Sequence, residues 1–182
     1  MNRNLKNPVS GVDVEVLVSS FESEGKLFRI RSTMRANQLN KAPYHYHKNF
    51  IEHFKVVKGQ LNMIVGNNRR ELTLCEGESY LVEALCPHTF WNSSNSPVTY
   101  TVDVEPAEQF EQALRINHAL AAKGLASSKG TPANIFHIAI LAKLGNTWFY
   151  GIPQWIQSGI FTIFATIGRI IGVERKLYKL ID

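Results

Sequence analysis

Hydrophobic and polar positions alternate in short runs along the first part of the chain. The clearest run is 27–35, where Phe28 and Ile30 fall on one face and Arg29 and Arg31 on the other. A period of two residues is typical of a half-buried strand, because successive side chains of a strand point to opposite faces. Turn-forming residues separate the runs, and no helical pattern lies between them. The sequence therefore predicts an antiparallel β-sandwich or barrel, with strands at residues 14–18, 27–35, 52–57, 61–65, 71–74, 79–82, 88–91 and 98–105.

The hydrophobic period changes after the last of these strands. Apolar residues recur at helical spacing over residues 107–123, which predicts an α-helix. A small, polar stretch follows and predicts a hinge near residues 126–131. Thr131-Pro132 then has the composition of a helix start. We therefore expect a β domain and a helical C-terminal extension, over residues 1–106 and 107–182.

The end of the extension, about residues 132–182, is strongly apolar. No charged residue occurs from residue 144 to residue 168, a length that a membrane-spanning helix needs. Polar residues fill the first half of this segment, and its denser apolar part, residues 159–173, is short and contains Arg169. Read as a helix, the segment is amphipathic, and its apolar stripe consists of Ile152, Ile156, Ile160, Ile163, Phe164, Ile167, Ile170 and Ile171.

Such a stripe is compatible with three placements. It packs on the β domain or on a second subunit, which is the commonest fate of an amphipathic helix. It lies in a lipid interface, with membrane-surface contact through residues 148–180. Or the segment spans a membrane. The sequence leaves these alternatives open.

Composition and charge narrow the class of protein. The chain has 182 residues, 45% hydrophobic and 19% charged, which excludes a disordered chain, a coiled coil and a disulfide scaffold. The start of the chain is polar, and Cys75 and Cys86 are its two cysteines. We therefore expect no signal peptide, a cytoplasmic protein with reduced thiols, and no thiolate metal cluster.

The net charge of +5 is not spread evenly along the chain. Residues 1–122 hold 13 basic and 13 acidic residues, so the excess lies in the apolar C-terminal part. A nucleic-acid-binding protein normally carries a basic face on its folded body. We therefore expect no nucleic-acid partner, and the basic tail favours a membrane surface or an acidic partner.

Three histidines and one glutamate form the most informative pattern. His45 and His47 are two residues apart, so in a strand both imidazoles face the same way. Glu52 heads the next apolar strand, and His88 begins another. Imidazole and carboxylate groups that converge inside a sandwich suit one first-row divalent metal ion. The spacing does not distinguish Fe, Mn, Zn or Ni.

At these residues the sequence resembles the cupin superfamily, as a small single-domain cupin with a helical extension. His45-x-His47-x4-Glu52-x6-Gly59 is similar to the first cupin motif, and Gly77 with His88-x3-Asn92 is similar to the second. The resemblance covers about residues 25–105. It implies an antiparallel double-sheet, jelly-roll-like barrel, with metal ligands His45, His47, Glu52 and His88.

The resemblance also implies partners and activities. Cupins commonly pair through their sheets, so we expect a homodimer. They include dioxygenases, isomerases, epimerases and cyclases, and Asn92 would support the end of a strand. The sequence departs from the family pattern at turn positions where glycine or proline is usual, so we expect a differently shaped turn before His88. These positions are Leu39, Glu83 and Leu85.

Strand parity predicts an apolar pocket around the metal. Phe54 and Val56 share the inward parity of Glu52, Phe90 shares that of His88, and Tyr46 lies at the mouth. Such a pocket favours a small organic ligand. The remaining histidines and Cys86 are expected in surface or packing roles, and no catalytic residue is assigned. The remaining histidines are His53, His118 and His137.

Three classes of function are consistent with the sequence. The first is a metal-dependent enzyme, dioxygenase-like or isomerase/epimerase-like, that acts on a small organic molecule. The second is a non-catalytic ligand-binding or sensing module. The third is a membrane-peripheral partner protein with a vestigial site. The fold alone does not decide among them.

Overall fold

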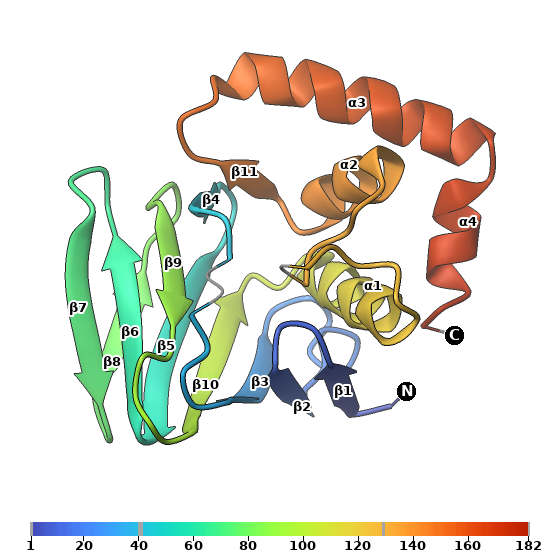
Figure 1. Ribbon diagram of the computed structural model, residues 1–182. Helices are drawn as coiled ribbons and strands as arrows, with labels where there is room; N and C mark the ends of the chain where they lie inside the picture. Colours follow the sequence, from blue (N-terminus) through green and yellow to red (C-terminus); the bar gives the residue numbers. More distant parts are fainter. Residues whose placement is uncertain (1, 40–41, 129, 182) are drawn as a thin grey trace.

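A computed structural model describes residues 2–39, 42–128 and 130–181. Two antiparallel β-sheets face each other, and four helices cover one end of them (Figure 1). The strands are β1 (Asn4–Asn7), β2 (Val12–Val18), β3 (Phe28–Met34), β4 (His45–His47), β5 (Ile51–Lys58), β6 (Gln60–Val65), β7 (Arg70–Cys75), β8 (Ser79–Val82), β9 (His88–Trp91), β10 (Val98–Glu105) and β11 (Thr147–Phe149).

The two sheets have the strand orders β1-β2-β3-β10-β5-β8 and β11-β4-β9-β6-β7. In the six-stranded sheet, β10 lies between β3 and β5, so Val102 is opposite both Ile30 and Phe54. In the five-stranded sheet, β9 lies between β4 and β6. The expectation of an antiparallel double-sheet β fold followed by C-terminal helices is confirmed.

The core lies between the two sheets, where the alternating residues meet. In β3, Phe28, Ile30 and Met34 are buried, while Arg31 and Thr33 between them are exposed. In the opposite sheet, Leu61, Met63 and Val65 of β6 are buried by the same alternation. Since apolar burial is the main favourable term in folding, this alternation fixes which face of each strand points inward.

Three strands lie outside the eight segments predicted from the alternating pattern: β1, β4 and β11. β1 is polar, and it pairs with β2 at the edge of the six-stranded sheet. β11 comes from the C-terminal extension, yet it pairs with β4, placing Thr147 opposite His47 and Phe149 opposite His45. The extension therefore completes the sheet at the strand that carries the His-x-His pair.

The helices are α1 (Phe110–Ala122), α2 (Ile135–Leu144), α3 (Gln154–Ile170) and α4 (Val173–Tyr178). The first lies within the expected segment. The second begins at Ile135 rather than at Thr131-Pro132, because the Asn134 side chain caps it by accepting a hydrogen bond from the Phe136 N–H. The helices form a second apolar core, and α3 crosses over α2 on the outside of the molecule (Figure 1).

The face that α3 buries differs from the expected isoleucine stripe. Its buried residues are Gln157, Phe161, Ala165 and Gly168. At Gly168 the helix approaches α2 so closely that an added Cβ would lie 3.2 Å from Ile140 Cδ1. Small residues permit this approach, so α3 packs through them and leaves most of the isoleucines outside. In the described part of the chain, no helix is both long and apolar enough to cross a membrane.

Candidate metal centre

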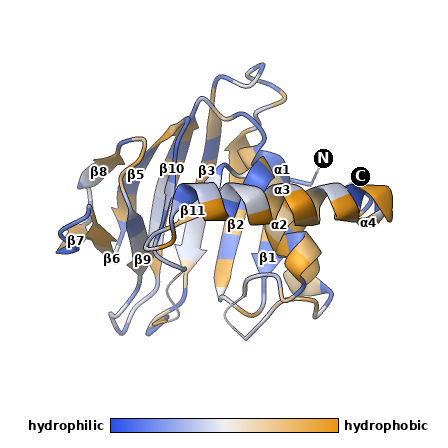
Figure 2. Ribbon diagram, turned by 90° about the horizontal axis from the view of Figure 1, so that it is seen from above, coloured by the Kyte–Doolittle hydropathy of each residue, from blue (hydrophilic) through white to orange (hydrophobic). Residues whose placement is uncertain are grey.

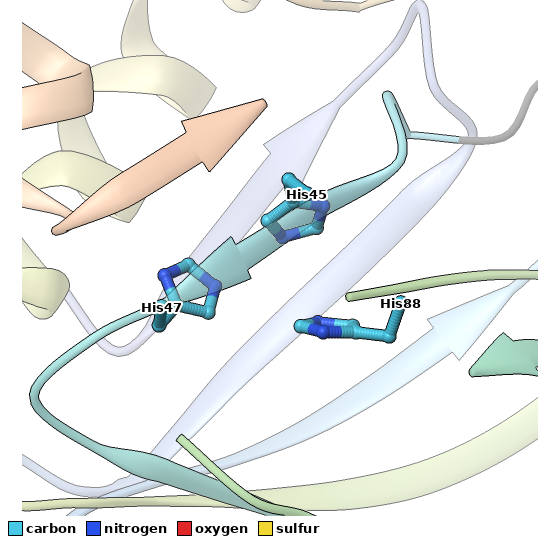
Figure 3. A group of neighbouring side chains, drawn as sticks. All are labelled: His45, His47 and His88. Atoms are coloured by element: carbon cyan, nitrogen blue, oxygen red, sulfur yellow. The ribbon is translucent and has the colours of Figure 1, made fainter. Parts of the chain in front are cut away.

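Strands β4 and β9 bring three histidines together. His45 is paired with His88 across the two strands, and His47 lies two residues further along β4. One ring nitrogen from each of the three lies within 4.8 Å of those of the other two. Figure 3 shows the three rings pointing toward one another from the two strands. The spacing of the two histidines in β4 therefore has the consequence expected from strand geometry.

Glu52 approaches this group from β5 of the facing sheet. Its Oε2 atom lies 2.9 Å from His88 Nε2 and 3.5 Å from His47 Nε2. Glu52, His47 and His88 are all buried, with exposed fractions of 6%, 4% and 0%. The structure thus gathers all four residues that the motif nominated, from both sheets.

The other ring nitrogen of each histidine lies against a backbone carbonyl. The Nδ1 atoms of His45, His47 and His88 lie 2.7 Å from Pro43 O, 3.0 Å from Gly145 O and 3.1 Å from Cys86 O. A carbonyl only accepts, so each Nδ1 carries a proton, and the Nε2 atom of each ring has a free lone pair when that ring is neutral. Metal-binding histidines are held in the same way.

Apart from the 2.9 Å contact between His88 Nε2 and Glu52 Oε2, the atoms that face the centre of the group have no hydrogen-bond partner. They are His47 Nε2, His88 Nε2 and Glu52 Oε2, all of them buried. Buried polar atoms normally have partners, because leaving one unpaired costs about 1–3 kcal/mol. A divalent cation would satisfy two imidazole lone pairs and a carboxylate oxygen at once. The donor set therefore fits a first-row metal ion.

The protonation states also suit a metal. Burial lowers the pKa of His45 well below its ordinary value and lowers that of His47 to about 4. Burial raises the pKa of Glu52, but the neighbouring histidines outweigh this and lower it to about 2. For His88 burial lowers the pKa, and the Glu52 carboxylate reverses this and raises it. At neutral pH, Glu52 is thus ionised and His45 and His47 are neutral, the forms that bind metals. Glu52 favours the protonated form of His88, so a metal that binds His88 Nε2 would displace a proton.

The turn before His88 keeps a glycine-like backbone. Leu85 occupies the position where glycine is usual and has a positive φ of 66°, a conformation that costs a branched side chain free energy. Its N–H donates to His47 O at 2.7 Å, which ties the turn to β4. Leu85 thus adopts a conformation that glycine adopts readily, and the different shape of the whole turn stays a prediction. Asn92 is fully buried and donates to Arg35 O and Ser96 O, as a supporting residue would.

Two cavities adjoin the histidine group. The larger, about 420 Å³, lies between the sheets and the helices and is called here the extension cavity; His45 is on its wall. The smaller, about 220 Å³, lies between the β strands and α1 and is called the barrel cavity; Glu52 is on its wall. Five residues line both: Ala42, Phe110, Leu114, Asn117 and Thr131.

The residues expected to line a pocket are divided between different surroundings. Phe54 and Phe90 line the barrel cavity. Val56 is fully buried in the core, and Tyr46 is half-buried on the face of β4 that points away from the histidines. Neither of these two lines the extension or the barrel cavity. His53 lies on the outer face of β5, half-buried.

The pattern of the sequence did not reveal the part that the extension plays at this site. The carbonyl groups of Gly145 and Asn146 hold His47 Nδ1, at 3.0 Å and 3.3 Å. Most of the extension cavity is lined by residues after Glu105. Every residue has a backbone carbonyl group, so the sequence does not indicate which carbonyls accept a hydrogen bond from a histidine.

Two facing antiparallel sheets with this cluster inside define a double-sheet β protein with a candidate metal centre. The family model for the cupin domain matches residues 33–105. The chain therefore contains a cupin domain, and the resemblance of its motifs is confirmed.

Several solved structures are similar to about half of this chain. One is a sugar phosphate isomerase of the cupin superfamily from Silicibacter pomeroyi, with 19% identity and a TM-score of 0.45 over 53% of this chain and 60% of that one. Another is the polyketide cyclase RemF from Streptomyces resistomycificus, with 14% identity and a TM-score of 0.49 over 58% of this chain and 78% of that one. A third is a predicted oxalate decarboxylase from Thermotoga maritima, with 15% identity and a TM-score of 0.47 over 52% of this chain and 79% of that one. A comparison with curated proteins finds no significant match.

Proposed function

We propose that this protein binds one divalent metal ion through His45, His47, Glu52 and His88 and binds a small organic molecule beside it. The observation that carries the proposal is the convergence of buried histidine Nε2 atoms on the Glu52 carboxylate, with no other partner for His47 Nε2, His88 Nε2 or Glu52 Oε2. Backbone carbonyls on the opposite ring nitrogens orient the three imidazoles. Three imidazoles and one carboxylate leave one or two coordination positions for a ligand.

The chain's own residues would position the ion and the ligand. Gly145 O, Pro43 O and Cys86 O orient the three imidazoles, and Glu52 is buried from the bulk solvent. A bound metal would supply Lewis acidity toward a ligand oxygen or nitrogen or, with a redox-active ion, oxygen chemistry. Metal-dependent catalysis of the dioxygenase or isomerase class and ligand sensing without turnover both use this arrangement.

Metal titration of a chelator-treated sample tests the proposal. Isothermal titration with Mn²⁺, Fe²⁺ under argon, Zn²⁺ and Ni²⁺ should give one equivalent for at least one ion. The double variant His45→Ala/His47→Ala should lose this binding and keep its circular dichroism spectrum. The matched control is His53→Ala, because His53 lies next to Glu52 in β5 but on the outer face. Full stoichiometry in the double variant would show that the metal binds elsewhere.

We further propose a homodimer. The support is the cupin domain alone, since proteins of this superfamily commonly pair through their sheets. Light scattering should give a mass of about twice 20.6 kDa. A monomer at micromolar concentration would contradict it.

A further inference from the structure

The two cavities beside the metal centre are lined mainly by apolar side chains. In the extension cavity these include Phe110, Leu114, Ile138, Leu141 and Phe149. Among the described residues on its wall there is no Lys, Arg, Asp or Glu; His45 is the ionisable group. A phosphate or carboxylate group placed here would lack a charged partner, and burying an unpaired charge is very costly. The lining therefore favours an uncharged, largely apolar ligand.

Two acceptor atoms at the cavities lack donors. Asn117 lines both cavities, and its Oδ1 atom is buried without a partner. His118 lines the barrel cavity, is only 5% exposed, and also has an unpartnered atom, Nε2. Because His118 Nδ1 donates to Leu114 O at 2.9 Å, its Nε2 is an acceptor. Burial lowers the pKa of His118, which keeps the ring neutral.

We propose that the cavities hold an uncharged, largely apolar alcohol or phenol, whose hydroxyl donates to Asn117 Oδ1 or His118 Nε2. The apolar body would fill the space between α1 and α2. This proposal names the class of ligand for the function proposed above. It rests on that function only in placing the ligand beside the metal ligands His45 and Glu52, which lie on the cavity walls. The volume of about 420 Å³ is within the range of small-molecule sites.

The probe for this site is 2-naphthol, with 2-methoxynaphthalene as a matched probe that has no donor. Fluorescence titration of chelator-treated protein should show that 2-naphthol binds about tenfold more tightly, the value of one hydrogen bond of about 1.4 kcal/mol. Asn117→Leu should reduce this preference to about threefold or less. Ala142→Leu, which adds a side chain at the wall of the extension cavity, should weaken both probes.

Controls separate this proposal from the metal site. Gln154 lies on α3 and lines neither cavity. Gln154→Leu should therefore leave the affinities for 2-naphthol and 2-methoxynaphthalene unchanged. Because the titration is done without metal, the failure of metal binding does not affect it. The proposal is overturned if 2-naphthol does not bind, if it binds no better than its ether, or if both variants bind like the wild type. Tighter binding of 2-naphthoate than of 2-naphthol would also overturn it.

A second, independent observation is the outer face of α3, called here the isoleucine face. Its most exposed residues are Ile170 (78%), Trp155 (77%) and Ile163 (58%). Ile152, Ile160, Ile167 and Ile171 accompany them and are 40–55% exposed. Figure 2 shows hydrophobic residues along the part of α3 that approaches α4. A monomeric protein rarely exposes a continuous apolar surface of this kind without a partner.

Positive charges flank one end of the isoleucine face. Arg175, Lys176 and Lys179 are exposed on and beside α4. Arg169 is exposed on α3 and pairs with Glu174, the acidic residue of these two helices, at 2.7 Å. A second copy of the chain would bring the same cations to this end and no unpaired carboxylate from α3 or α4. An anionic lipid surface complements both the charge and the apolar face.

We propose that the isoleucine face docks on a membrane surface that contains anionic lipids. The test is flotation with phosphatidylcholine vesicles that contain about one third phosphatidylserine. The full chain should float with these vesicles, less with phosphatidylcholine alone, and less at high salt. Ile163→Asp/Ile170→Asp should abolish flotation.

The matched control is Ser158→Asp/Thr162→Asp, which adds the same charge to exposed polar positions of α3. This variant should keep most of the binding. Failure of the wild type to float overturns the proposal, as does equal loss in both double variants. A dimer in light scattering that Ile163→Asp/Ile170→Asp converts to a monomer would assign the face to a second copy instead.

Discussion

Replacing Glu111 by glutamine should strongly destabilise the protein, because this carboxylate joins α1 to the β fold. Glu111 is fully buried and accepts hydrogen bonds from Ser19 Oγ, Ser20 N, Ser20 Oγ and Arg115 Nε, at 2.6–3.0 Å. Arg115 is itself only 4% exposed and also donates to Asn2 O. Removing one partner of a buried ion pair typically costs about 3–5 kcal/mol, so Glu111→Gln should lose about that much free energy of unfolding.

The effect should depend on pH in a defined direction. Burial raises the pKa of Glu111, but hydrogen bonds from Ser20, Arg115 and Ser19 outweigh this and lower it below its ordinary value of 4.5. A folded-state pKa below the unfolded value stabilises the protein fully above about pH 4.5, and this contribution is lost as the pH falls through the folded pKa. The difference between wild type and Glu111→Gln should therefore be constant at higher pH and shrink in acid.

Urea unfolding at pH 7, pH 5 and pH 3.5 measures both effects. The matched control is Glu15→Gln, which breaks an exposed pair with Arg31 at 3.0 Å and should cost less than about 1 kcal/mol. A loss below about 1 kcal/mol at pH 7 for Glu111→Gln would refute the reasoning. If the difference in the free energy of unfolding between wild type and Glu111→Gln grew in acid, the predicted direction of the pH dependence would be wrong.

Three further predictions concern the extension, a strained turn and the metal. Gln157→Leu should lower the free energy of unfolding by about 2–4 kcal/mol, since Gln157 makes three hydrogen bonds of 2.8 Å to backbone groups of Phe149 and Ile152. The control variant Gln154→Leu should change the free energy of unfolding by no more than about 0.5 kcal/mol. Equal losses in the two variants would contradict the prediction. Leu85→Gly should raise the free energy of unfolding, measured with denaturant, by about 1 kcal/mol, because it relieves a positive φ of 66° at an exposed leucine. A lower free energy of unfolding in this variant would contradict the prediction. Metal at a thousand times its Kd should stabilise the wild type by about 4 kcal/mol in thermal or urea unfolding, and an equal gain after removal of the β4 histidines would contradict the assignment of the site.

The alternating pattern predicted the β fold and the histidine group well, because both follow from local geometry. In β3 the buried and exposed positions can be assigned from neighbours two residues apart. His45 and His47 share a face for the same reason, and the apolar strand after Glu52 determines that its carboxylate points inward. The position of His88 beside His45 could be predicted from the cupin motif but not from the alternating pattern, because the pairing of β9 with β4 joins segments that are far apart in the sequence.

The extension was harder to predict, because shape and long-range pairing decide its structure. β11 has only three residues, and its pairing with β4 links segments about one hundred residues apart. In α3, the isoleucine stripe is mostly exposed and another face is buried, so hydropathy does not select the buried face. Close contact does: Ala165 and Gly168 are small enough to lie against α2, and Gln157 is buried because its amide satisfies backbone groups.

Elemental analysis tests the central claim most directly. The protein should be purified without a metal-affinity column and compared with His88→Ala, since His88 is fully buried and its Nε2 faces the cluster beside Glu52. The account predicts about one equivalent of a first-row metal in the wild type, either as purified or after reloading, and a marked loss in His88→Ala. No metal in the wild type after reloading, or the same content in both proteins, would contradict it.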